Sequence, residues 1–179
     1  MNPILDMLMN AAGGTAVQEV GKRFGLSENQ ASGALGQLVP AIMAGLQRNT
    51  SQEGGMEALL GALSGGNHSE YLDNPELLGQ EGTTEDGNSI LGHIFGSKDV
   101  SRAVASHAAE ETGIGADVLK KLLPVAATMV MGSLSKQRAT APAEEAGGIG
   151  FLTSLLDQNR SGSAVDEVAG LLGRFLSGR

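Results

Sequence analysis

Apolar side chains recur three and four positions apart along most of this chain, with polar residues between them. This spacing places the apolar residues on one face of an α-helix, whereas a half-buried strand would alternate at every second residue. The predicted helices begin at Pro3, cover residues 15–24, 28–47, 56–63 and 98–112, and include a long helix after Gly113.

The starts of these helices carry capping signals. Asn2 followed by Pro3 suits a cap and a first helical residue. Ser27 and Gln30 have the spacing of a capping box, which predicts a helix start near Glu28. Ser97 is the expected cap of the helix over residues 98–112.

Residues 25–49 and 113–137 share one apolar pattern at an ungapped offset of 88 positions. The identical pairs are Gly25 with Gly113, Leu35 with Leu123, Met43 with Met131 and Leu46 with Leu134. Each predicted helix contains a proline, Pro40 or Pro124, but the prolines do not align. Because proline has no N–H for the turn behind it, we expect a kink or a break at Pro40. The pattern predicts two weakly related helical halves that share one core.

This pattern divides the chain as follows: a helical domain over residues 1–137 (halves 1–66 and 88–137, connector 67–87), a linker over 138–148 and a C-terminal segment over 149–179. The connector is expected to hold at most one helical turn, at residues 76–79. The C-terminal segment is predicted to form a helical hairpin whose last helix is amphipathic. Its apolar stripe consists of Val165, Val168, Leu171, Leu172, Phe175 and Leu176. A helix this short must dock on the body, on another copy or on a partner.

Composition supports an all-α fold. The 179 residues include 27 Gly and four Phe, but only one Tyr and no Trp. A core built from Ala, Leu, Val, Ile and Met suits close helix packing, whereas β-sheets draw on more aromatic and β-branched residues. We therefore expect an all-α helical array of two related halves plus the C-terminal hairpin.

The net charge of −8 disfavours nucleic-acid binding, and no basic cluster is visible along the chain. No Lys or Arg occurs between Asn49 and Ser97, where carboxylates accumulate. This acidic region is interpreted as a solvated surface or, alternatively, as an acidic docking surface.

Three further sequence features indicate the cellular compartment of the protein. The chain has no Cys, which excludes disulfides, thiolate catalysis and cysteine-ligated metals. The start lacks the basic region of a secretory signal. The longest apolar stretch, residues 122–134, is shorter than the roughly 20 residues that span a bilayer, and it contains Pro124. A soluble, cytoplasmic protein without a membrane partner is expected.

Two glycine clusters, at residues 33–36 and 170–173, fall where helices are predicted. A glycine inside a helix is destabilising by about 1 kcal/mol relative to alanine, so a compensating role is expected. We interpret both clusters as close crossings of helices, and the alternative is a gap that admits a ligand. Neither cluster matches a phosphate-binding loop.

Two groups of polar residues could each supply part of a metal site. His107 with Glu110 and Glu111 would supply half of a metal site, but nothing nearby completes it. Residues 157–163 resemble the front half of a calcium loop, yet Val168 occupies the twelfth position and Arg160 lies inside. We interpret these residues as a polar turn in which Ser161 or Ser163 caps the last helix, and the alternative is weak Ca²⁺ binding by the loop over residues 157–167.

Several motifs together resemble a known family. They are Gly25-Leu26-Ser27, Leu38-Val39-Pro40 to Leu46-Gln47-Arg48-Asn49, Ile90-Leu91-Gly92-His93-Ile94-Phe95-Gly96, Leu122-Leu123-Pro124 to Met131-Gly132-Ser133-Leu134, Leu155-Leu156-Asp157 and Gly170-Leu171-Leu172-Gly173. With these motifs the chain resembles the bacterial YidB-like family, classed as domain of unknown function 937, over nearly its whole length. The resemblance implies an all-helical fold and no settled activity, so it assigns no site residue.

The sequence therefore predicts a non-enzymatic protein that acts through a protein partner or as a homo-oligomer, by apolar helix faces or the C-terminal helix. No catalytic, cofactor-binding or metal-binding residue is assigned, because no nucleophile–base–acid motif is present. The second hypothesis is a small-molecule or weak Ca²⁺-binding module that uses the 157–167 loop or a glycine-lined helix gap.

Overall fold

In the computed structural model, which describes residues 3–140, all regular secondary structure across that range is helical, with no strand. The α-helices are α1 (Pro3–Asn10), α2 (Thr15–Phe24), α3 (Glu28–Thr50), α4 (Gly55–Gly65), α5 (Glu70–Asp73), α6 (Glu81–Phe95), α7 (Lys98–Thr112) and α8 (Ala116–Thr140). Two 3₁₀ turns, Ala11–Gly14 and Pro75–Gly79, join them. The all-α prediction is confirmed. The predicted C-terminal hairpin, the 157–167 loop and the 170–173 glycines lie outside the described residues.

The predicted starts of α3 and α7 are confirmed, whereas the predicted cap Asn2 lies outside the described residues. Ser27 Oγ accepts from the Gln30 amide at 3.2 Å, and the Gln30 side chain accepts from the Ser27 amide at 2.9 Å, which completes the capping box. Ser97 Oγ accepts from the Val100 amide at the start of α7. Gly25 and Gly113, which end α2 and α7, have φ angles of 66° and 70°, a left-handed conformation that glycine adopts without strain.

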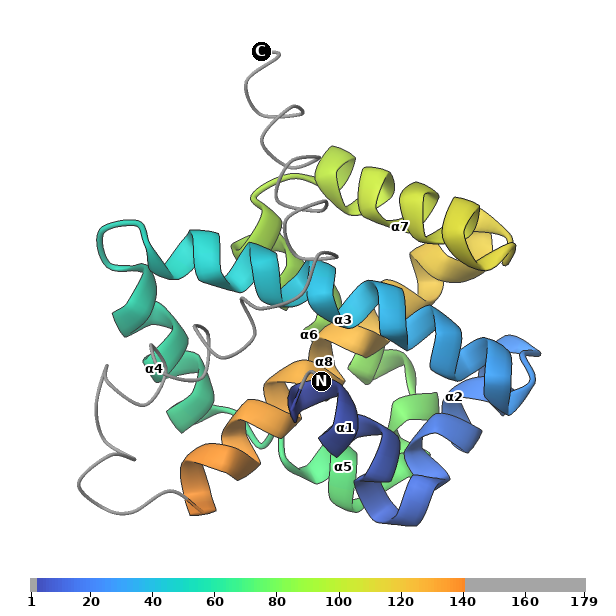
Figure 1. Cartoon of the computed structure of the whole chain (residues 1–179). Coiled ribbons are helices and arrows are strands. Elements are labelled where there is room, and N and C mark those ends of the chain that lie inside the picture. The colour runs from blue at the N-terminus through green and yellow to red at the C-terminus, as the bar shows by residue number, and fades with distance from the viewer. Residues whose placement is uncertain (1–2, 141–179) are drawn as a thin grey trace.

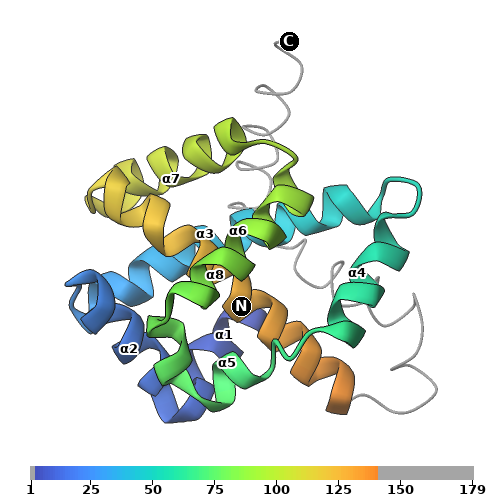
Figure 2. The same cartoon turned by 180° about the vertical axis from the view of Figure 1, so that it is seen from behind.

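The two long helices, α3 and α8, form the centre of the molecule. Figure 1 shows α3 crossing in front of α8, and Figure 2 shows α6 crossing α8 on the other side. Every residue of α8 from Leu122 to Leu134 is buried, as is every residue of α3 from Leu38 to Leu46. A helix buried on all sides needs apolar residues all round, which is what these two segments have.

Burial explains the high hydropathy of α8. By length and composition α8 could cross a membrane, and it is the one helix among the described residues that meets this criterion. Yet 78% of its apolar window is buried inside the fold. Core helices of soluble proteins have the same composition.

A break at Pro40 is not observed, since α3 runs without interruption to Thr50 and α8 likewise continues through Pro124. Each proline removes one hydrogen bond, to the carbonyl of Gly36 or Lys120 respectively. Both prolines are buried among apolar neighbours on the same helix. Tertiary packing therefore maintains each helix across its missing bond.

The connector predicted over residues 67–87 contains far more helix than one turn, because α5, a 3₁₀ turn and the first half of α6 lie there. Leu72 and Leu78 are buried and anchor this region to the core. Thr83 is buried too, and its hydroxyl donates to the Leu77 carbonyl. Side-chain burial thus offsets the low helix propensity of a segment rich in glycine and carboxylates.

Close helix crossings do occur at glycines, but not at Gly33 and Gly36. These two glycines face open space, so the interpretation of residues 33–36 as a crossing was wrong, whereas residues 170–173 lie outside the described residues. The crossing of α6 over α8 instead occurs at Gly87, where a β-carbon would overlap the Pro124 carbonyl. A β-carbon on Gly132 would lie 2.6 Å from the His68 carbonyl oxygen. Periodicity alone did not identify these positions, because they depend on which helix faces meet.

Gly87→Ala should therefore lower the free energy of unfolding by about 3 kcal/mol, because the overlap is with backbone and the two helices must separate. The matched control is Gly92→Ala, in the same helix but in open space. That change should raise stability by about 0.5–1 kcal/mol, because alanine is the better helix former. Urea denaturation of both full-length variants measures the difference. Equal effects at the two positions would contradict the assigned crossing.

Candidate functional site

A cleft of about 300 Å³ opens between α4 and the ends of α3 and α6. We call it the α4 cleft. It is lined by Leu46, Asn49, Gln52, Glu53, Gly54, Gly55, Ala58, Leu59, Ala62, Ile90, His93, Ile94 and Met131. Its volume is at the lower end of the range for ligand pockets, and most of its walls are apolar with a few polar groups at the edge.

The turn between α3 and α4 shapes this cleft. Gly54 has a φ of 77°, and a β-carbon on Gly55 would overlap the Asn49 carbonyl, so the chain can reverse tightly only with glycine. The Asn49 side chain donates from Nδ2 to the His93 carbonyl at 2.8 Å. This bond ties the end of α3 to α6 and holds two walls of the cleft together.

The outer face of α4 is exposed and made of small residues. Leu59 and Leu63 are buried on the inner face, whereas the outer face presents Ala58, Gly61, Ala62 and Gly65. These four positions follow the i, i+3, i+4, i+7 spacing of one helix face. The stripe is visible in the sequence as a spacing pattern, but only the fold shows that it faces outward beside a cleft.

Carboxylates border this surface. Glu53 lines the cleft, and Glu57 is exposed on α4 one turn from Gly61. No Lys or Arg is among the described residues that line the cleft. The α4 cleft is therefore an apolar hollow with an acidic edge.

A second cleft, of about 480 Å³, lies at the start of α7. Three cationic side chains from two helices line it: Lys98, Arg102 and Lys120. The sequence alone did not show that these cations share a cleft, because Lys120 lies on a different helix, α8. Arg102 pairs with Asp99 at 3.0 Å and Lys120 with Asp117 at 3.2 Å, which leaves little local excess of positive charge.

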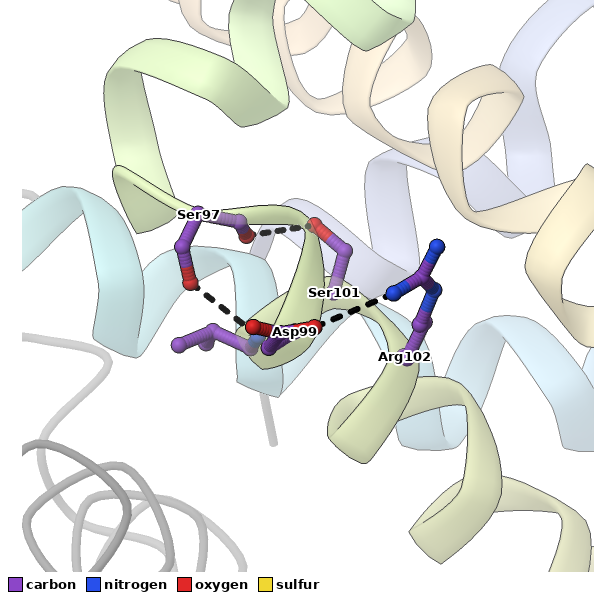
Figure 3. A network of polar contacts seen from close by, with 5 residues as sticks. Ser97, Asp99, Ser101 and Arg102 are labelled. Carbon is purple, nitrogen blue, oxygen red and sulfur yellow. Dashed lines mark hydrogen bonds and ion pairs between the residues drawn. The ribbon is translucent and has the colours of Figure 1, made fainter. Parts of the chain in front are cut away.

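Figure 3 shows how the start of α7 satisfies its own polar groups. The Ser101 hydroxyl donates to the Ser97 carbonyl at 3.5 Å, and the Ser97 hydroxyl caps the Val100 amide. Arg102 reaches back one turn to Asp99. These contacts stabilise the helix end, so the second cleft is built mainly from groups that already have partners.

A His–Tyr–Asp group forms where the predicted connector meets α6. The Tyr71 hydroxyl donates to Asp86, and the His68 and Tyr71 rings are 6.4 Å apart. Burial and the Asp86 carboxylate raise the pKa of Tyr71 to about 12. Burial lowers the pKa of His68, and the nearby Asp86 charge opposes this shift only in part. A phenol held in its neutral form is a poor nucleophile, and none of these three residues lines the clefts described above.

The other polar residues singled out from the sequence do not converge. His68, His93 and His107 lie on different elements, and His107 shares α7 with Glu110 and Glu111. Within residues 3–140, no group of three or more His, Asp or Glu side chains is placed to hold a metal ion. His93 is the one of the three histidines that lines the α4 cleft.

The shifted pKa of His68 predicts a specific pH dependence. The unfolded chain binds this proton near the ordinary pKa of 6.5, whereas the folded protein binds it only at lower pH. As the pH falls from 7 to 5, the unfolded state therefore gains more protons and the free energy of unfolding decreases. In His68→Gln this contribution disappears, so the stability of the variant should fall less over that interval. Denaturant titrations at several pH values test this, and parallel curves for both proteins would contradict it.

A family of bacterial proteins matches most of the chain. Residues 6–137, which run from α1 into the last turns of α8, match the model of a family described as bacterial protein of unknown function (DUF937). No curated protein and no solved structure matches the chain. The matched range covers the α4 cleft and all helices that form it. The chain therefore belongs to DUF937, a family of bacterial proteins whose function is unknown.

Proposed function

We propose that this protein is a non-enzymatic interaction module that binds an apolar helix against α4. The observation that carries the proposal is the exposed stripe of small residues on α4, next to a cleft with apolar walls. Helix-in-groove recognition needs such a surface, because small side chains on one helix let the backbone of another approach closely.

The chemistry of the cleft supports a helical ligand. Leu59, Ile94 and Met131 offer apolar contact at its base, and Ala58 and Ala62 leave room above them. The acidic edge at Glu53 favours a ligand with Lys or Arg beside its apolar residues. A helix that carries both features would bury apolar surface and pair charges at the rim.

A small molecule is the second candidate ligand. The cleft volume of about 300 Å³ suits a compact apolar compound, with His93 and Asn49 available at the edge. Gly33 and Gly36 do not line a gap that could admit a ligand, because both face open space on α3. Calcium binding by residues 157–167 remains a sequence-based prediction.

The proposal extends to the setting of the protein. A cytoplasmic protein that binds a protein partner or a second copy, rather than nucleic acid or a membrane, fits the net charge of −8 and the burial of α8. The YidB-like identity within the wider family is likewise proposed, from the sequence motifs around Pro40 and Pro124. No catalytic residue is assigned.

Ala62→Glu should weaken binding, because it places a charge in an apolar contact without a partner. Full-length protein, chemically crosslinked in bacterial lysate and by itself over a dilution series, would reveal bound proteins and oligomers. We expect the variant to recover about tenfold less of any bound species, since a loss near 1.4 kcal/mol already has that effect.

Ser106→Glu is the matched control, because Ser106 is exposed on α7, away from α4 in both views of the molecule (Figures 1 and 2). It should behave as the unmodified protein. If Ala62→Glu and Ser106→Glu recover the same species in equal amounts, α4 is not the interaction surface. A protein that stays monomeric and captures nothing would reject the interaction module itself.

A further inference from the structure

We propose that the α4 cleft is the docking site for residues 169–179 of the same chain, the last part of the C-terminal segment, which we call the docking segment. This inference rests on the proposed function, because it names the ligand that fills the cleft before an external partner arrives. Docking within one molecule would make the segment an internal competitor of any partner helix.

The first argument is the point where the described chain ends. The last turn of α8 lies beside the end of α4, since Arg138 Nη1 donates to Ser64 Oγ at 2.6 Å. Figures 1 and 2 both show this end of α8 next to α4. Ser64 lies two residues beyond Ala62 and therefore on a different face of α4 from the cleft. The remaining residues of the chain therefore start near the C-terminal end of α4, the helix that forms one wall of the cleft.

The second argument is the sequence of the segment. Its apolar residues, Leu171, Leu172, Phe175 and Leu176, follow helical spacing. A stripe of this kind needs an apolar partner surface, because a short isolated helix is only marginally stable in water. The cleft supplies such a surface.

The third argument is charge. Residues 169–179 carry Arg174 and Arg179 and no Asp or Glu. The cleft has Glu53 at its edge, Glu57 lies on the exposed side of α4, and no Lys or Arg is among the described residues that line the cleft. Opposite charges at the rim favour this segment over an acidic helix and define its orientation.

The fourth argument is reach. Residues 141–168 connect α8 to the segment, and a chain of that length can reach up to about 90 Å. Helix α4 is about 16 Å long at 1.5 Å per residue, so the connection is long enough for docking within one molecule. Docking within one molecule does not depend on protein concentration, so it is favoured over docking between two copies in dilute solution.

Energy transfer between two dyes can test this directly, because the natural chain has no Cys. Asn67→Cys, exposed just after α4, and Ser177→Cys would carry a donor and an acceptor on one full-length chain. The doubly labelled protein is measured in a hundredfold excess of unlabelled protein, with a urea-unfolded sample as reference. We expect transfer well above the unfolded value and unaffected by the excess.

Two changes should reduce this transfer at least twofold: Leu172→Gln combined with Phe175→Gln in the segment, and Ala62→Glu in the cleft. The matched controls are Glu167→Gln, just before the docking segment and outside the apolar stripe, and Ser106→Glu on α7, which should leave the transfer unchanged. Transfer equal to the unfolded value, or equal in all variants, would overturn the proposal. Transfer that disappears in unlabelled protein would assign the cleft to the segment of a second copy instead.

The two proposals fail separately. If dye transfer behaves as expected but no external protein is recovered, the segment docks and the interaction module lacks support. If partners bind through α4 and the dyes report no docking, the interaction module stands and internal competition is rejected. If both hold, Leu172→Gln with Phe175→Gln should increase partner recovery severalfold, because the competitor is removed.

Discussion

Burial of α8 is the constraint on which the rest of the structure depends. Thirteen consecutive residues, Leu122 to Leu134, lie away from solvent, and no single neighbouring helix can cover all sides of such a segment. Helices α3, α6 and α7 pack around it, with α1 and α5 at its other end. Each fully buried Leu, Val or Met contributes about 1.5–3 kcal/mol, so this one helix accounts for a large part of the driving force for folding.

Glycines decide how closely the surrounding helices approach α8. At Gly87 the backbone of α6 packs against the carbonyl of Pro124. At Gly132 the backbone of α8 packs against the carbonyl of His68. With α6 held at this depth, Ile90 and Ile94 point toward the space below α4, and Asn49 bonds to the His93 carbonyl. The candidate site is thus a consequence of how the core packs, because two of its walls are the ends of core helices.

Helix α4 differs from the core helices in what it presents to solvent. It buries Leu59 and Leu63 on one side and leaves Ala58, Gly61, Ala62 and Gly65 exposed on the other. Exposed small residues contribute little to folding, and two glycines in a helix of 11 residues lower its stability. In the proposed function these small residues let a second helix approach closely, and the acidic edge restricts which helices can bind. The interaction proposed at α4 and the internal competitor both follow from this combination.

The sequence by itself determined the fold class, the starts of the capped helices and the ends of α2 and α7. These features depend on contacts between residues close in the chain, such as Ser27 with Gln30, or on the backbone freedom of Gly25 and Gly113. Only the tertiary structure decided which glycines lie at crossings, that Pro40 does not interrupt α3, and that the connector folds into helix. It also brought together the α4 cleft, the three cations beside α7 and the group of His68, Tyr71 and Asp86. All of these depend on residues far apart in the chain, whose proximity is set by burial of α8 and not by local spacing.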